Sequence, residues 1–359
     1  MSKPDPLDKS PKKAVKPLSI NPDAAKDFLS RKKNKPNPSH LTEGILKGDR
    51  VLLSQAITLI ESENPEHQTI AHQIIENCLP HAGKSIRVGI TGSPGVGKST
   101  FIESIGKHVT GLDHKLAVLA IDPSSQLSRG SILGDKTRMA KLAADPNAFI
   151  RPSPSGSSLG GVARKTRETI LLCEAAGFDT IIVETVGVGQ SEMTVHSMVD
   201  FFLLLLLPGA GDELQGIKRG IVEMADLITV NKADGDRIDA AKLTKRQYRN
   251  ALHLYPPKEN NWTPNVMDCS ALNNQGIDEI WKTILDYQQK MMANQYFQKK
   301  RQQQSLQWFH ESINGLLKDL FYRDAEMKEA LTKIEKAILE EKQSPFRAAK
   351  TLIELFIKS

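Results

Sequence analysis

Short apolar runs alternate with helix-like segments through the middle of the chain. The runs are IRVGIT (86–91), LAVLAI (116–121), DTIIVE (179–184), FFLLLLL (201–207), DLITVN (226–231) and NVMDCS (265–270). They are short and rich in β-branched or aliphatic side chains, which favours buried strands over helices. Continuous apolar strands between helices predict an α/β fold with a mostly parallel, doubly wound sheet covered on both faces.

Helical periodicity flanks this central region on both sides. Residues 41–80 place apolar side chains three and four apart, which predicts two helices that break near Asn64 and Pro65. The strands end at Gly276, and residues 277–357 have the pattern of helices. Their apolar stripes are Leu306, Phe309, Ile313, Leu316 and Leu320, followed by Met327, Leu331, Ile334 and Ile338. Such stripes pack within one chain or on a second subunit, and the length of the segment favours self-association.

The net charge of +6 resides in the first 40 residues. This leader carries ten Lys/Arg and four Asp/Glu, whereas the rest of the chain carries 38 of each. It also holds seven of the nineteen prolines, a composition that predicts a disordered basic leader or an arm that docks on an acidic partner. The balanced charge of the body argues against a nucleic-acid-binding surface.

Cysteine usage and hydropathy point to a compartment. Cys78, Cys173 and Cys269 are widely separated and odd in number, which fits a reducing environment. No apolar run approaches the roughly 20 residues that a membrane helix requires. The N-terminus lacks an apolar signal region and contains several Asp residues. We therefore expect a cytoplasmic protein that does not engage a membrane.

A glycine-rich loop follows the first predicted strand. GSPGVGKST satisfies the pattern G-x-x-x-x-G-K-[ST] between a strand and a helix, where backbone N–H groups cradle phosphates. Lys98 should bridge the outer phosphates, and Ser99 should donate its hydroxyl oxygen to Mg²⁺. Nucleotide contacts are expected from Gly92, Ser93, Pro94, Gly95, Val96, Gly97, Lys98, Ser99 and Thr100.

Two motifs at the ends of later strands indicate guanine. In NKAD (231–234), the carboxylate of Asp234 offers two acceptors to the donor pair of guanine, which adenine lacks. Asn231 belongs to the same motif, and the aliphatic stem of Lys232 can cover the base. In SAL, the residues Ser270, Ala271 and Leu272 end the next strand and present a backbone N–H to the guanine carbonyl. The motifs together favour GTP and GDP over ATP.

Three acids occupy positions suited to a magnesium ion. Asp122 and Glu184 end strands, and Asp135 lies in a segment beside a glycine. Because Mg²⁺ takes one or two carboxylates beside phosphates and waters, some of the three must act through water. A further mobile-loop pattern, PGAGDELQGIKRG (208–220), brings Lys218 or Arg219 toward phosphate or a neighbouring protein.

The stretch ETVGVGQSE (184–192) reads as a modified hydrolysis switch. Gly187 can free its N–H for the terminal phosphate, but Val188 stands where a small GTPase positions water with glutamine. Gln190 compensates only if the loop folds back. We therefore expect slow basal hydrolysis that a partner completes, with Lys98, Glu184, Gln190 and Lys218 as the candidate catalytic residues.

Seven motifs in this order resemble one family. GITGSPGVGKSTFIE, AIDPSS, GDKTRM, RPSPS…LGGVA, ETVGVGQSE, PGAGDELQGIKRGI and NKAD resemble the methylmalonyl-CoA mutase-associated GTPases, the MeaB/ArgK family of P-loop G proteins. The resemblance covers about residues 41–340. It implies a homodimeric GTPase that acts as a chaperone of a coenzyme-B12-dependent acyl-CoA mutase, gating adenosylcobalamin loading and protecting or reactivating the mutase.

The same resemblance assigns roles and domains. The residues that match the family's site are Lys98 and Ser99 for phosphate and metal, Asp234 for the base, Asp122, Asp135 and Glu184 for the metal, and Lys218 in a loop that couples hydrolysis to the partner. The expected domains are the leader (1–40), an N-terminal helical extension (41–84), a P-loop G domain (85–276) and a C-terminal helical dimerisation region (277–359).

Other functions remain open from the sequence. A P-loop metallochaperone would need a Cys/His cluster, and no C-x-x-C or His-rich tract is present in the sequence. A transport-associated kinase or ATPase would prefer adenine, against the NKAD motif. A GTP-dependent binding module would hydrolyse GTP negligibly.

Overall fold

The computed structural model describes residues 36–121, 139–152, 159–185, 191–209 and 219–358. Its core is a seven-stranded sheet in the order β3-β2-β4-β1-β5-β6-β7, in which every neighbouring pair is parallel. The strands are β1 (Ile86–Gly92), β2 (Leu116–Ile121), β3 (Ala148–Arg151), β4 (Thr180–Thr185), β5 (Phe201–Leu206), β6 (Leu227–Val230) and β7 (Asn265–Asp268). The predicted fold class and all six predicted strands are confirmed, and β3 is an additional strand.

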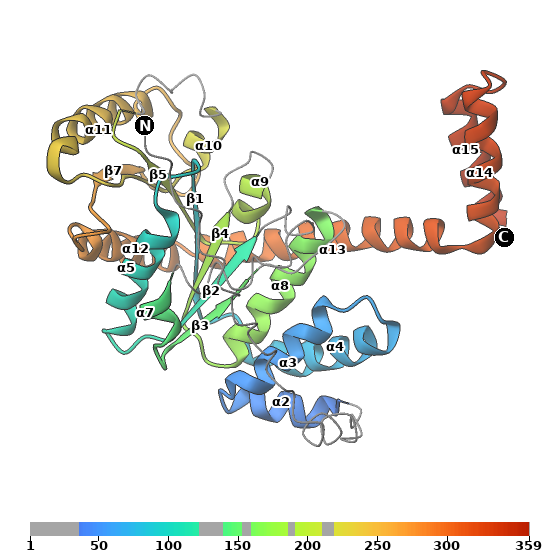
Figure 1. Cartoon of the computed structure of the whole chain (residues 1–359), viewed down its shortest axis with the longest axis horizontal. Coiled ribbons are helices and arrows are strands. Elements are labelled where there is room, and N and C mark those ends of the chain that lie inside the picture. The colour runs from blue at the N-terminus through green and yellow to red at the C-terminus, as the bar shows by residue number, and fades with distance from the viewer. Residues whose placement is uncertain (1–35, 122–138, 153–158, 186–190, 210–218, 359) are drawn as a thin grey trace, which may run out of the picture. The chain divides into compact units, whose positions relative to one another are not determined.

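Helices lie on both sides of this sheet (Figure 1). They are α2 (Pro38–Leu46), α3 (Arg50–Glu61), α4 (Pro65–Cys78), α5 (Lys98–Thr110), α7 (Ala140–Ala143), α8 (Leu159–Ala175), α9 (Ser191–His196), α10 (Arg219–Met224), α11 (Ile238–Leu252), α12 (Ile277–Ala293), α13 (Tyr296–Arg323), α14 (Ala325–Leu339) and α15 (Pro345–Lys358). Among the described residues, no helix combines the length and apolar character needed to cross a membrane.

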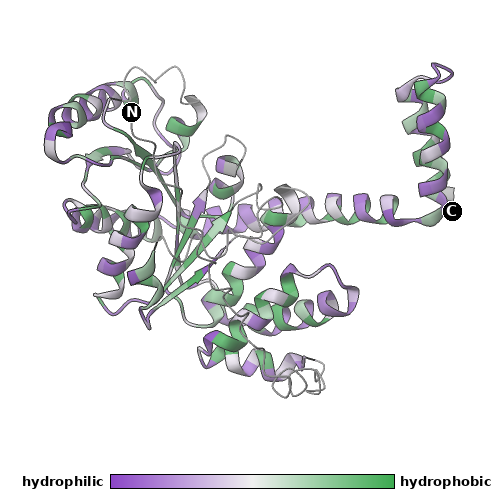
Figure 2. Cartoon of the chain, viewed as in Figure 1, coloured by the Kyte–Doolittle hydropathy of each residue, from purple (hydrophilic) through white to green (hydrophobic). Residues whose placement is uncertain are grey.

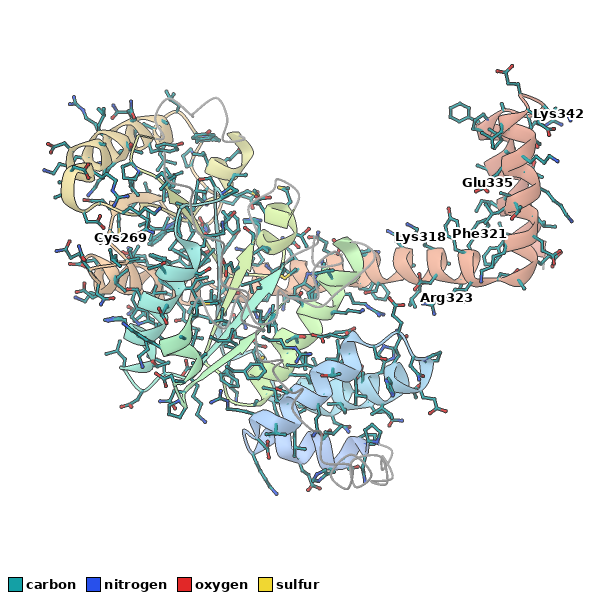
Figure 3. The ribbon with its side chains drawn as sticks, in the orientation of Figure 1. Cys269, Lys318, Phe321, Arg323, Glu335 and Lys342 are labelled. Carbon is teal, nitrogen blue, oxygen red and sulfur yellow. The ribbon has the colours of Figure 1, made fainter. Side chains whose placement is uncertain are left out.

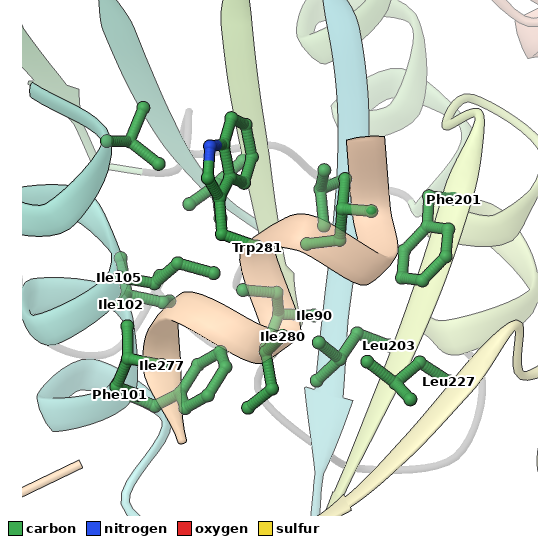
Figure 4. Packing of buried hydrophobic residues seen from close by; sticks show 14 of the residues in the cluster. Ile90, Phe101, Ile102, Ile105, Phe201, Leu203, Leu227, Ile277, Ile280 and Trp281 are labelled. Atoms are coloured by element: carbon green, nitrogen blue, oxygen red, sulfur yellow. The ribbon is translucent and has the colours of Figure 1, made fainter. Parts of the chain in front are cut away.

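One face of the sheet is covered by α5 and α12. Trp281 and Ile280 of α12 pack with Phe101 of α5 and with Ile90 of β1, and all four are almost fully buried (Figure 4). The helix that follows Gly276 therefore belongs to the core beneath the glycine-rich loop. Aromatic and branched side chains in contact here remove much apolar area from water, the main favourable term in folding.

The opposite face carries α8 and α9, with α2, α3 and α4 packed outside α8. The predicted break at Asn64–Pro65 is confirmed, because α3 ends at Glu61 and α4 begins at Pro65. The sequence predicted two helices in this region, but the structure has three, α2, α3 and α4. Gly48, with φ of 78°, ends α2, and Asp49 caps α3 by accepting hydrogen bonds from the N–H groups of Val51 and Leu52.

A buried group of charges ties α13 to the sheet. Arg87 of β1 donates two hydrogen bonds of 2.9 Å to Glu174 of α8, and Arg301 of α13 donates to both carboxylate oxygens of Asp200. Ser85 donates to Glu174 at 2.6 Å. The side chains of Glu174 and Asp200 are each 1% exposed. Buried charges need such partners, because an unpaired one costs several kcal/mol.

The two apolar stripes of the C-terminal helices differ in how far they are buried. Met327, in the second stripe, is fully buried. Phe321 of α13, labelled in Figure 3, contacts Phe356 of α15 with 5.3 Å between ring centroids. The first stripe stays exposed: Leu306, Phe309, Ile313, Leu316 and Leu320 are 62%, 58%, 37%, 56% and 62% accessible. Figure 2 shows these apolar positions interleaved with polar ones along α13. The second stripe thus packs within the chain, whereas the first does not.

Candidate functional site

The glycine-rich loop joins the carboxyl end of the central strand β1 to α5. Gly92 has φ of 155°, and a Cβ there would lie 2.6 Å from the carbonyl oxygen of Leu205. Gly97 has φ of 91°, and a Cβ there would lie 3.0 Å from the side-chain nitrogen of Asn231. Both positions therefore require glycine, which leaves the loop's N–H groups accessible to an anion. The loop contains Ser93, Pro94, Gly95 and Val96, and the first turn of α5 contains Lys98, Ser99 and Thr100.

Lys98 lies at the centre of this loop. Its Nζ donates to the carbonyl of Gly92 at 2.8 Å and to that of Ser93 at 3.4 Å. Burial lowers the pKa of the Lys98 ammonium, while the negative charges of Glu184 and Glu192 act in the opposite direction. The ammonium is thus held by two carbonyls of the loop, at a point where a phosphate would meet it.

Asn231 binds the neighbouring loops to one another. Its Nδ2 donates to the carbonyl of Val96 at 2.9 Å, and its Oδ1 accepts from the N–H of Ala271 at 3.2 Å. Asn231 is buried, and 1% of its surface is exposed. The phosphate loop, NKAD and SAL are therefore brought together, as the sequence predicts. Asn231 positions these loops through its hydrogen bonds.

Asp234 lies beside Ser270 and Arg237. Ser270 Oγ donates to Oδ2 at 2.5 Å, and Arg237 donates to Oδ1 at 2.9 Å. The hydrogen bond from Ser270 and the charge and hydrogen bond of Arg237 lower the pKa of Asp234 below its usual range. The group is then a carboxylate at neutral pH, with acceptors only, as pairing with the guanine N1–H and amine requires. Lys232 Nζ donates to the carbonyl of Gly95 at 2.7 Å, and Leu272 is exposed.

Replacing Asp234 by asparagine is expected to weaken GTP binding by about tenfold to a hundredfold. The asparagine side chain has an NH₂ donor in place of one of the two acceptor oxygens of Asp234, and this donor would face a donor of guanine. The hydrogen bond from guanine to a charged group is therefore lost. Xanthosine triphosphate, which offers an acceptor there, should bind the variant better than GTP does. Titration with both nucleotides measures this, and an unchanged affinity for GTP would contradict the assignment of the guanine site.

Glu184 is the penultimate residue of β4, which lies beside β1. Its Cα pairs in register with Ile90 of β1 and Ala120 of β2, so it lies at the carboxyl edge of the sheet. Beside it, Thr185 donates its hydroxyl to that of Thr91 at 2.9 Å. Parallel strands bring ligand-binding groups to this edge. The predicted site residues Asp122, Asp135, Gly187, Gln190 and Lys218 lie outside the described residues, so their roles stay predictions.

Glu192 is an acid that the sequence reasoning missed. It lies in the first turn of α9, is 3% exposed, and its charge acts on Lys98 together with that of Glu184. Glu192 was not predicted because it lies in a helix and does not end an apolar strand. The available signal was a second acid eight residues after Glu184 in the same motif.

A cavity with a volume of about 840 Å³ is lined by residues that include Met193, Asp226, Trp262 and Lys300. Asp226 precedes β6, so the cavity opens at the amino edge of the sheet, opposite the phosphate loop. Among the residues that the structure describes, no predicted site residue lines this cavity.

A parallel sheet with a phosphate loop after its central strand, and an acceptor carboxylate beside it, defines a P-loop guanine-nucleotide-binding protein. The sequence profile of the family described as methylmalonyl Co-A mutase-associated GTPase MeaB matches residues 53–326. The chain belongs to this family and is a GTPase, as the resemblance of its motifs predicts.

Relatives agree with this assignment. The chain is 49% identical over 316 residues to a putative GTPase of Caulobacter vibrioides, covering 88% of this chain and 97% of that protein. It is 45% identical over 326 residues to the methylmalonic aciduria type A homolog, mitochondrial, of Mus musculus, covering 88% and 79%. A crystal structure described as LAO/AO transport system kinase superposes with a TM-score of 0.71 at 38% identity, covering 91% and 99%.

Proposed function

We propose that this GTPase is a chaperone of a coenzyme-B12-dependent, methylmalonyl-CoA-type mutase. It gates adenosylcobalamin loading and protects or reactivates the mutase. The observation that carries the proposal is the match of residues 53–326 to a family described as associated with methylmalonyl Co-A mutase. The name of the mouse relative supports it. We also propose a cytoplasmic location, with no nucleic-acid or membrane partner.

The proposal includes a magnesium ion beside GTP. Ser99 and Glu184 are oxygen donors on elements that flank Lys98, and oxygen is the ligand that Mg²⁺ prefers. The described residues contain no group of three or more His, Cys, Asp or Glu side chains able to hold a metal by themselves. Two of the three predicted metal acids, Asp122 and Asp135, lie outside these residues, so their part in binding the ion stays a prediction. Such an ion would supply charge stabilisation on the phosphates.

The proposal also includes a homodimer formed through α13. Its exposed first stripe runs for several turns, and water-exposed apolar rows of this length mark interaction surfaces. A second copy of the same helix offers a matching apolar row. Residues 277–359 are the proposed dimerisation region, with α12 also serving the core.

A transport-associated kinase is the alternative function, because a similar solved structure is described as a transport system kinase. It would transfer phosphate from ATP to a substrate. The carboxylate of Asp234 instead suits guanine, because adenine lacks the donor pair. We therefore favour GTP hydrolysis linked to a protein partner.

Mixing the chain with the B12-dependent mutase of the same organism is expected to change the GTP hydrolysis rate. Basal turnover should be slow, because Val188 stands where a water-positioning glutamine would be, and the partner supplies the rearrangement that completes the site. Phosphate release with and without the mutase measures this, with albumin as a control for unspecific effects. If the mutase neither binds in any nucleotide state nor alters the rate, the chaperone proposal is wrong.

A further inference from the structure

Three side chains of α13 hold the main chain between α9 and β5. Lys300 Nζ donates to the carbonyl of Asp200 at 2.7 Å, Gln304 Nε2 to that of Val199 at 2.9 Å, and Trp308 Nε1 to that of Ser197 at 3.1 Å. Spacings of four residues place the three donors on one side of the helix. We call Lys300, Gln304 and Trp308 the donor face of α13.

The indole of Trp308 is also fixed from the side of α8. The guanidinium of Arg167 lies over the ring, 5.1 Å from its centroid, and pairs with Glu311 of α13 at 2.5 Å. The Arg167 side chain is 8% exposed, so this stacking and pairing take place largely out of water. The indole of Trp308 therefore has little freedom to move. A shift of Ser197 would lengthen or break the hydrogen bond that Trp308 donates to the Ser197 carbonyl.

The segment held by the donor face follows α9 directly. The charge of Glu192, near the start of α9, acts on the Lys98 ammonium, and α9 contacts β1 and β4. Ser197 comes directly after α9 ends at His196. Val195 and Val199 are fully buried, and a Cβ on Gly89 of β1 would lie 2.9 Å from Val195 and 3.0 Å from Val199. Packing this close moves as a unit, so a change at the phosphate loop displaces the carbonyls that the donor face binds.

The other side of α13 carries the exposed first stripe. Leu306 lies between Gln304 and Trp308 in the sequence, and Phe309 directly follows Trp308. Their exposed fractions are 62% and 58%. Gln304, in contrast, is 5% exposed. One helix thus joins a contact with the segment next to the phosphate site to an apolar row suited to a second copy.

We propose that the donor face of α13 couples nucleotide state to self-association. The proposal rests on the homodimer proposed above. A terminal phosphate at Lys98 shifts α9, the three carbonyls move, and α13 changes its seating and the presentation of its apolar stripe. Coupling of this kind is reciprocal, so self-association alters nucleotide affinity by the same factor.

The dissociation constant of the dimer tests the coupling. Sedimentation equilibrium of the full chain with GDP, and with a non-hydrolysable GTP analogue, should give constants that differ by about fivefold or more. In the double variant Gln304→Leu, Trp308→Phe, which loses two of the three donors, we expect the difference to fall below about twofold. Gln303→Ala, an exposed position on the same helix, should keep the wild-type difference.

Each result decides a different point. A wild-type dimer of equal strength with both nucleotides overturns the coupling and leaves the homodimer standing. A chain that is monomeric with both nucleotides overturns the homodimer and the coupling together. A double variant that keeps the full difference overturns the role of the donor face. Circular dichroism verifies folding, and Trp308→Phe alone, which keeps a ring beneath Arg167, tests the same contact with a smaller change.

Discussion

Replacing Lys98 by alanine is expected to lower the rate of GTP hydrolysis by about a hundredfold or more. The ammonium is held at the loop by the carbonyls of Gly92 and Ser93, and we propose that it binds the outer phosphates there. Charge develops on those oxygens in the transition state, and removing one preorganised donor from such a site typically costs a hundredfold to a thousandfold. Phosphate release at saturating GTP measures the effect.

Lys107→Ala is the matched control for this variant. Lys107 lies on the same helix, α5, but pairs with Asp145, and its side chain is 47% exposed. Lys107 is not one of the predicted site residues, so this variant should hydrolyse GTP within about twofold of the wild type. If Lys98→Ala keeps more than a tenth of the wild-type rate while still binding nucleotide, Lys98 does not have the proposed role.

The sequence predicted six of the seven strands. β3, Ala148–Arg151, escaped prediction although β6 and β7, which were predicted, also have only four residues. Its position is determined by pairing with β2, which no local pattern reveals. The extra break before α3 was readable in principle, because Gly48 and Asp49 are ordinary helix-ending and helix-starting residues.

The site was predictable where one motif carries its own chemistry. The phosphate loop and NKAD specify both residue type and position, and the structure brings them together as expected. Two other features depend on tertiary packing. The hydrogen bond from Ala271 to Asn231 joins residues 40 apart, and the charge of Glu192 acts on Lys98 because α9 packs against β1 and β4. Spacing along the chain does not reveal the first, and for the second it offers only the position of Glu192 eight residues after Glu184.

Long-range charge pairing also decides how α13 is anchored. Arg87, Glu174, Asp200 and Arg301 come from four separate parts of the chain, and each looks in sequence like an ordinary surface charge. Only the fold shows that they are buried together. Once buried, each becomes costly to remove alone, since its partner is left without compensation.

Glu174→Gln is expected to lower the free energy of unfolding by about 3–5 kcal/mol, the usual cost of removing one partner of a buried ion pair. The amide keeps the size of the side chain but leaves the guanidinium of Arg87 buried without its anion. Burial by itself raises the pKa of Glu174, but Arg87 and Ser85 outweigh it, so the folded-state pKa lies below the usual value. Its stabilisation is therefore present above the unfolded pKa, about 4.3, and is lost as the pH falls through the folded pKa.

Chemical denaturation at neutral pH measures this loss, and repeating it in acid tests the sign. The wild type should lose stability below about pH 4 more steeply than Glu174→Gln, because the variant has no carboxylate to protonate at this position. Asp286→Asn is the control: its carboxylate pairs with Lys290 on the surface of α12, with side chains 51% and 60% exposed, and should change stability by less than about 1 kcal/mol. A Glu174→Gln protein as stable as this control would show that the buried pair of Arg87 and Glu174 does not stabilise the fold.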